Sequence, residues 1–157
     1  MDESTVTLDV IFDGQCGVCT RAAAWLARRD RHGRVALHPA QRPGVCERFG
    51  VSAEAARTAV WAIERKVTGG GAAYRGAAAV NRAVEVALGV RGLSGLYVVP
   101  GITALQNRVY RWVADHRHRL PGATPWCTAH PADCGGAADA GAGTVAGVVA
   151  DTAGRRL

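Results

Sequence analysis

The feature that most constrains the fold is a strand pattern that passes into a helix pattern through a short turn carrying two cysteines. Residues 5–12 read Thr-Val-Thr-Leu-Asp-Val-Ile-Phe, a run rich in β-branched and aromatic residues that predicts a strand. Asp13-Gly14 is a turn signal, and from Val18 the apolar residues recur at helical spacing. A second strand pattern follows at Val35–His38. Strand, helix and strand within about thirty-five residues predict a βαβ unit with parallel strands.

The rest of the chain predicts an α/β fold in which a β-hairpin and additional C-terminal helices follow the βαβ unit. In chain order we expect helical pieces at 43–49 and 53–57, a strand at 58–64, a turn at Gly69-Gly70-Gly71, a strand at 72–75, a helix at 77–88 and a helix from Pro100 to about Leu120. The apolar stripes of the last two helices are Val80, Val84 and Leu88, and then Ile102, Leu105, Val109, Trp112 and Val113. Trp25, Trp61 and Trp112 are expected on core faces, and the apolar stretch Leu93–Val99 belongs either to the core or to an interface.

The chain of 157 residues is about one domain long. We expect that domain to occupy residues 1–134. Residues 135–157 are mostly Gly, Ala and Val, with no large apolar residue before Leu157. Such a composition buries too little surface to offset the entropy of ordering, so we expect a mobile Gly/Ala-rich tail.

Charge and hydropathy exclude several classes of protein. The net charge of +6 comes from arginines scattered along the sequence, with one local cluster at Arg117-His118-Arg119. We therefore do not expect a nucleic-acid partner. The sequence contains no unbroken run of eighteen or more apolar residues, so it predicts no membrane-spanning helix. The start, Met1 to Thr5, is acidic and lacks the basic and apolar segments of a secretory signal, so we expect a cytoplasmic protein.

The pair Cys16-Gly17-Val18-Cys19 falls where the first strand passes into the helix. The free N–H groups and positive dipole end of a helix N-terminus favour a thiolate and lower its pKa. A disulfide that closes so short a loop removes only about 2 kcal/mol of unfolded-state entropy, so it opens and closes readily. We expect redox exchange, in which Cys16 attacks as the thiolate and Cys19 resolves the mixed disulfide.

The run Ile11 to Cys19, with the pattern D-x-x-C-x-x-C at Asp13, Cys16 and Cys19, resembles the signature of the DCC thiol-disulfide oxidoreductases. The likeness continues through Tyr74-Arg75-Gly76 and Val109-Tyr110-Arg111-Trp112 to Arg117-His118-Arg119, and spans roughly residues 6–127. The resemblance implies a thioredoxin-like fold and protein-disulfide reductase activity. Its partners would be a protein or small-molecule disulfide and an external thiol reductant, and we expect no bound cofactor.

Asp13 has two interpretations. It is a turn residue or helix cap whose carboxylate accepts backbone N–H bonds. Alternatively, it is a catalytic carboxylate that takes the proton of Cys19 during resolution. A carboxylate so close to Cys16 would also oppose formation of the thiolate.

One element of the wider thioredoxin pattern is missing. Those proteins place a cis-proline before the third core strand, facing the cysteines, where it docks the backbone of the substrate. Ala56-Arg57-Thr58 lead into the predicted strand here, and Pro39 and Pro43 come too early.

The remaining cysteines leave an alternative open. Cys127, His130 and Cys134 could join Cys16 and Cys19 in a Cys₃His or Cys₄ zinc site, which would make the chain a zinc-stabilised binding module. A reversible disulfide between Cys127 and Cys134, or two free thiols, fits the spacing as well. Cys46 is expected to be a small buried hydrophobic residue.

Overall fold

The computed structural model describes residues 7–65, 71–92, 95 and 98–135. Its strands are β1 (Leu8–Phe12), β2 (Val35–Pro39), β3 (Trp61–Glu64) and β4 (Ala73–Arg75). Its helices are α1 (Gly17–Arg29), α2 (Val45–Phe49), α3 (Ala53–Thr58), α4 (Ala77–Leu88), α6 (Pro100–His116), α7 (Trp126–Ala129) and the 3₁₀ helix η2 (Pro131–Cys134).

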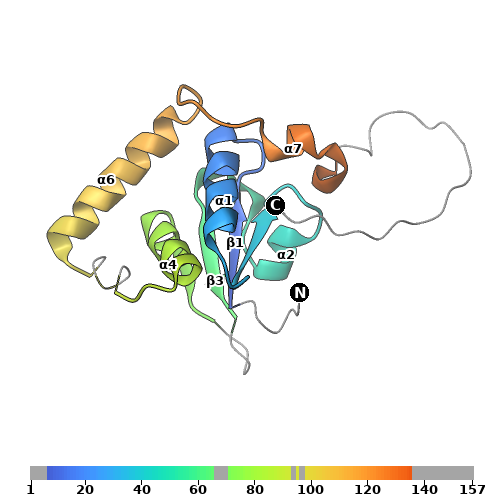
Figure 1. Ribbon diagram of the computed structural model, residues 1–157. Helices are drawn as coiled ribbons and strands as arrows, with labels where there is room; N and C mark the ends of the chain where they lie inside the picture. Colours follow the sequence, from blue (N-terminus) through green and yellow to red (C-terminus); the bar gives the residue numbers. More distant parts are fainter. Residues whose placement is uncertain (1–6, 66–70, 93–94, 96–97, 136–157) are drawn as a thin grey trace, which may run out of the picture.

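The four strands form one mixed sheet in the order β2-β1-β3-β4 (Figure 1). β1 and β2 are parallel, with Leu8 opposite Val35, and α1 connects them as the predicted βαβ unit. β3 lies antiparallel to β1 and pairs with β4 as the predicted hairpin. The sheet and its helices thus confirm the thioredoxin-like α/β fold expected from the sequence.

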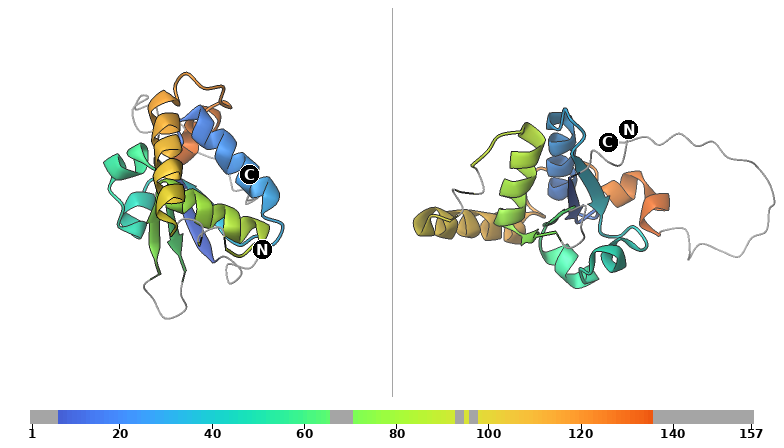
Figure 2. Two further views of the ribbon diagram at one scale, coloured as in Figure 1. Left: turned by 90° about the vertical axis from the view of Figure 1, so that its left-hand side faces the viewer. Right: turned by 90° about the horizontal axis from the view of Figure 1, so that it is seen from below.

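Helices cover both faces of the sheet, and β1 is buried on both sides (Figures 1 and 2). Alternate residues of a strand point to opposite faces. Leu8 and Val10 pack with residues of α1 and α4, whereas Ile11 packs with residues of α2 and α3. The continuous apolar run of β1 therefore marks a central strand, and its last residue, Phe12, leads directly into the turn that carries the cysteines.

Several boundaries differ from the prediction, among them the start of β3 and the end of α6. The third strand begins at Trp61 rather than Thr58, because Thr58 ends α3, where its hydroxyl donates to the carbonyl oxygen of Ala55 at 3.0 Å. The last long helix ends at His116, before the predicted end near Leu120. Helix α4 has the predicted bounds.

The apolar stripe predicted for α4 is buried only in part. Val84 is half-buried and packs against the core, but Val80 and Leu88 are each 42% exposed. The buried residues of the helix against β1, β3 and α1 are Ala79, Ala83 and Ala87. Alanine side chains allow a helix to approach its neighbours closely, and that approach decides which stripe of α4 faces the core.

The stripe predicted for α6 is wrong, since this helix has no buried residue. Polar contacts that join it to the domain include the bond from Asn81 of α4 to Gln106 and the bond from the backbone N–H of Val60 to the hydroxyl of Tyr110 at 3.0 Å. Leu105, Val109 and Trp112 are each more than half exposed. Figure 2 shows α6 at the edge of the molecule, beside α4.

The tryptophan expectations hold only for Trp61. It is half-buried and packs against the core cluster that contains Ile11, with the guanidinium of Arg75 over its ring. Trp25 and Trp112 are exposed. The buried tryptophan is Trp126, which is 7% exposed and packs with Phe12 and Ala23.

Several expected segments lie outside the described residues. They are the tail beyond Gly135, most of the stretch 93–99, and residues 66–70 of the hairpin turn. In the part of the chain that the structure describes, no helix combines the length and the hydropathy needed to cross a bilayer.

Away from the cysteines, a buried carboxylate of β1 contacts residues of β2 and of the segment that follows β3. Asp9 of β1 is 2% exposed, and its carboxylate accepts a hydrogen bond from Arg65 at 2.8 Å and lies 2.8 Å from Nε2 of His38. Burial alone would raise the pKa of Asp9, but the bonds and charges of Arg65 and His38 outweigh it and lower the pKa to about 2.

We predict that Asp9→Asn lowers the free energy of unfolding by about 2 kcal/mol at pH 7, because it removes the buried negative charge that pairs with the guanidinium of Arg65. The ionised carboxylate stabilises the fold above the unfolded-state pKa near 4, and that contribution disappears as the pH falls toward 2. Urea unfolding at several pH values should therefore show the two proteins converging in acid. Glu54→Gln, at an exposed residue, is the control, and an equal loss in that variant would contradict the prediction.

Candidate active site

The cysteine pair lies at the N-terminal end of α1, where β1 has just ended. Cys16 is the N-cap residue, and its sulfur accepts the backbone N–H of Cys19 at 3.2 Å. The thiol of Cys19 points at the same sulfur, with 2.6 Å between the two Sγ atoms. Both residues are free cysteines. The structure thus brings the two predicted sulfurs together, with Cys16 as the acceptor of both bonds.

These bonds make the two thiols unequal. The hydrogen bond from the Cys19 thiol lowers the pKa of Cys16 to about 6, although burial acts in the opposite direction. The Cys19 amide and the charge of Arg117 support the thiolate, while the charge of Asp13 opposes it. The pKa of Cys19 is raised far above its usual value, because its proton is held by the Cys16 sulfur and because the thiol is desolvated. Near neutral pH the thiolate form of Cys16 is therefore favoured, whereas Cys19 keeps its proton.

Asp13 lies directly before this turn and is 8% exposed. One carboxylate oxygen accepts the backbone N–H of Gln15 at 3.0 Å and the side-chain amide of Gln41 at 2.8 Å. The other oxygen lies 3.3 Å from a guanidinium nitrogen of Arg117. The turn-residue interpretation of Asp13 is therefore realised in the structure, and its carboxylate also lies within electrostatic reach of both cysteines.

The segment between α6 and α7 crosses the start of α1 (Figure 1). The N–H of Ala123 donates to the carbonyl of Gly17 at 3.0 Å, and Arg21 reaches the carbonyl of Pro121. A Cβ on Gly17 would lie 2.5 Å from the carbonyl oxygen of Ala123, so only glycine leaves room for this crossing. We call residues 121–125 the covering segment. Beneath this part of the fold Cys16 is only 4% exposed.

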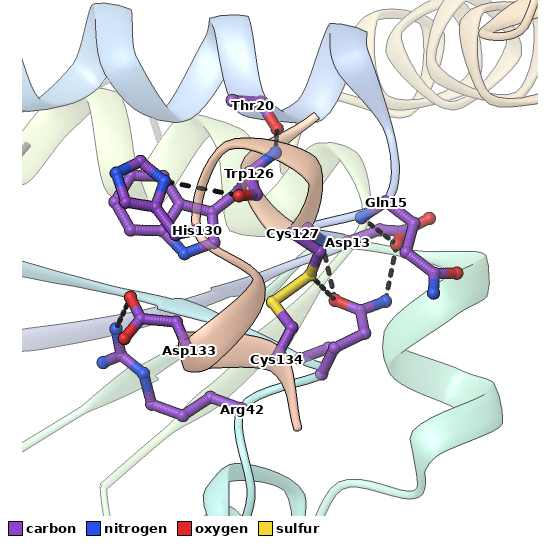
Figure 3. The surroundings of a disulfide bond; sticks show 12 residues. Asp13, Gln15, Thr20, Arg42, Trp126, Cys127, His130, Asp133 and Cys134 are labelled. Carbon is purple, nitrogen blue, oxygen red and sulfur yellow. Dashed lines mark hydrogen bonds and ion pairs between the residues drawn. A yellow bond between two sulfur atoms is a disulfide. The ribbon is translucent and has the colours of Figure 1, made fainter. Parts of the chain in front are cut away.

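A disulfide between Cys127 and Cys134 lies beside the same turn (Figure 3). The N–H of Cys127 donates to the carbonyl of Gly14 at 3.0 Å. A Cβ on Gly14 would lie 2.9 Å from the sulfur of Cys127, so the glycine permits this close approach. The bridge closes a loop of a few residues and removes only about 2–3 kcal/mol of unfolded-state entropy.

The disulfide contradicts the alternative of a zinc site formed by these cysteines. Cys127 and Cys134 are bonded to each other, so they are not thiolates that could ligate a metal together with Cys16 and Cys19. His130 stacks on the ring of Trp126 instead. Among the residues that the structure describes, no group of three or more His, Cys, Asp or Glu side chains is arranged to hold a metal ion.

The other predicted positions agree with their simplest interpretations. Cys46 is buried, and its thiol donates to the carbonyl of Ala40 at 3.4 Å. No cis peptide bond occurs among the described residues, as expected from the missing proline. At the start of β3, the backbone N–H of Val60 is occupied by the hydroxyl of Tyr110.

Sequence reasoning missed three residues around the site. Gln41 bridges the turn, because its side chain donates to Asp13 and accepts the N–H of Gly14 at 2.8 Å. Arg117 approaches Asp13 from the end of α6, and Tyr110 lies close enough to Cys19 that a charge on Cys19 would raise the pKa of Tyr110. The resemblance had marked Tyr110 and Arg117 as part of the family pattern, but Gln41 carries no local signal.

Comparison with known proteins agrees with this geometry. The family model described as DCC1-like thiol-disulfide oxidoreductase matches residues 10–123, which is more than half of the chain. The match includes Asp13, Cys16 and Cys19 and ends before Cys127. No curated protein and no solved structure matches the chain.

We predict that Cys19→Ala raises the pKa of Cys16 from about 6 toward that of an ordinary thiol, because the variant loses the thiol donor. Alkylation of Cys16 by iodoacetamide at pH 7 should slow by on the order of tenfold. Cys19→Ser keeps a hydroxyl donor and should retain most of the low pKa. A pH–rate profile that is the same in Cys19→Ala and wild type would contradict this assignment.

We predict that Gly17→Ala displaces the covering segment, because the new methyl group overlaps the carbonyl of Ala123. The free energy of unfolding should fall by about 1–2 kcal/mol, and Cys16 should be alkylated faster. Measuring alkylation at pH 8, where Cys16 is already ionised, makes the rate report access to the sulfur rather than its pKa. Gly101→Ala, which meets nothing within 4 Å, is the control. A slower rate than wild type would show that the segment does not shield Cys16.

Proposed function

The chain belongs to the DCC1-like thiol-disulfide oxidoreductase family, and from that premise we propose that it reduces disulfide bonds with Cys16 and Cys19 as its catalytic dithiol. The observation that carries the proposal is the double hydrogen bond from Cys19 to the sulfur of Cys16 at the start of α1. It favours a thiolate on one cysteine while keeping the proton on the other. This is the protonation state in which a dithiol begins an exchange.

The reaction proceeds in two exchanges. The thiolate of Cys16 attacks one sulfur of the substrate disulfide, a mixed disulfide forms, and the other substrate sulfur leaves as a thiolate. Cys19 then loses its proton and attacks the sulfur of Cys16, and the second substrate thiolate leaves. Two electrons pass to the substrate, and the enzyme is left with a Cys16–Cys19 disulfide. An external thiol reductant restores the dithiol, and in the cytoplasm, the proposed location, the glutathione and thioredoxin systems supply such thiols.

Asp13 is proposed as the proton acceptor for Cys19 in the second exchange. Its carboxylate is buried beside the pair, and its negative charge raises the pKa of both thiols. Once Cys16 has become part of a mixed disulfide, the sulfur that held the proton of Cys19 no longer bears a charge. A neighbouring carboxylate can then take that proton. The contact with Arg117 limits how strongly Asp13 opposes the Cys16 thiolate in the first exchange.

The substrate class is a protein or small-molecule disulfide. Because Cys16 is 4% exposed, a protein substrate requires the covering segment to move away from the start of α1. The covering segment is joined to α1 by the single backbone bond from Ala123 to Gly17 and by the exposed contact from Arg21 to Pro121. These are few and partly exposed bonds, which is typical of a region that opens locally at low cost.

We predict that wild-type protein catalyses the reduction of insulin by dithiothreitol and that Cys16→Ser lowers the rate to the uncatalysed level. Cys19→Ser should retain the first exchange and accumulate a mixed disulfide on Cys16, which mass spectrometry detects. Cys46→Ala removes a buried sulfur outside the site and should keep the wild-type rate. Equal turnover by wild type and Cys16→Ser would refute the proposed reductase activity.

A further inference from the structure

Residues 126 and 127 form hydrogen bonds with residues that precede and follow Cys16 in the sequence. The backbone N–H of Trp126 donates to the hydroxyl of Thr20 at 3.0 Å, four residues after Cys16. The N–H of Cys127 donates to the carbonyl of Gly14, two residues before it. Two bonds to one turn of the chain therefore hold Cys127 alongside the reactive pair.

Side-chain contacts give the same placement. Cys19, Cys127 and Cys134 all pack against one small cluster formed by Phe12, Ala23 and Trp126. Gln41 links the two sites, because its amide nitrogen donates to Asp13 and its oxygen lies 3.8 Å from the sulfur of Cys127. A Cys127 thiol would find a hydrogen-bond acceptor already in place at this oxygen.

Exposure distinguishes Cys16 from the other three cysteines of the two pairs. Cys16 is buried, whereas Cys19, Cys127 and Cys134 are half-buried. The chain's own disulfide therefore lies beside the turn that carries Cys16 and is partly open to solvent. The matched family region ends before Cys127, so the family assigns no role to this bridge.

We propose that Cys127–Cys134 is a second redox centre, which exchanges two electrons with the Cys16–Cys19 dithiol within one chain. The thiolate of Cys16 attacks the sulfur of Cys127, and Cys134 leaves as a thiolate. Cys19 then gives up its proton and attacks Cys16, and Cys127 leaves as a thiolate. The Cys16–Cys19 pair is oxidised to a disulfide and the Cys127–Cys134 pair is reduced to two thiols, so no further oxidant or reductant is needed. The proposal rests on the redox activity proposed above for Cys16 and Cys19.

The test starts from the full chain with Cys127–Cys134 oxidised, and with Cys16–Cys19 also oxidised where both of those cysteines are present, and follows reduction by dithiothreitol. Samples are quenched in acid, alkylated and mapped by mass spectrometry, so that the state of each pair is measured separately. We predict that Cys127–Cys134 is reduced at least about tenfold faster in wild type than in Cys16→Ser, at a rate independent of protein concentration. Cys19→Ser, which cannot resolve, should pass through a monomer containing a Cys16–Cys127 bond. Cys46→Ala is the control and should behave as wild type.

The outcomes separate the two proposals. Reduction of Cys127–Cys134 at one rate in wild type and Cys16→Ser, with no Cys16–Cys127 bond in Cys19→Ser, overturns the internal exchange. The insulin assay on Cys127→Ser/Cys134→Ser then still reports the reductase activity of Cys16 and Cys19 on its own. If that double variant is inactive while the internal exchange is observed, the internal exchange stands and external reduction depends on the second pair.

Discussion

The chemistry of this protein depends on two hydrogen bonds that converge on one sulfur. The amide and the thiol of Cys19 both donate to Cys16, and they can do so because Cys16 caps the helix and Cys19 lies one turn further along it. A strand buried on both faces fixes the start of that turn, since Phe12 is held in the core immediately before it. The buried sheet therefore fixes the position of the Cys16 thiolate. The pKa of Cys16 is lowered mainly by the hydrogen bonds from Cys19, which the start of the helix positions, and not by the charge of Arg117 alone.

A second important feature is the segment of the chain that returns across the start of α1. Residues 121–127 run beside residues 14–20 and are attached through backbone groups of Gly14 and Gly17, where any side chain would collide. Both glycines thus serve close approach rather than an unusual backbone conformation. The same crossing places a disulfide beside the turn that carries Cys16.

Local patterns in the sequence predicted the elements whose formation depends mainly on residues close together in the chain. The β1–α1–β2 unit, the hairpin and the bounds of α4 follow from periodicity and turn residues, and the position of Cys16 and Cys19 follows from the unit that contains them. Periodicity failed where a choice between faces depended on a distant neighbour, as in α4 and α6. The bonds of Gln41 and Arg117 to Asp13 join residues far apart in the chain, and the spacing of residues carries no information about such contacts.

Helix α6 has a consequence that concerns the whole site. Tyr110 holds the start of β3 and Arg117 holds Asp13, and the two residues lie about 10 Å apart along the same helical rod. On the outer side of that rod, Leu105, Val109 and Trp112 face solvent. Because one helix makes both contacts, a displacement of α6 would act on the start of β3 and on Asp13 together.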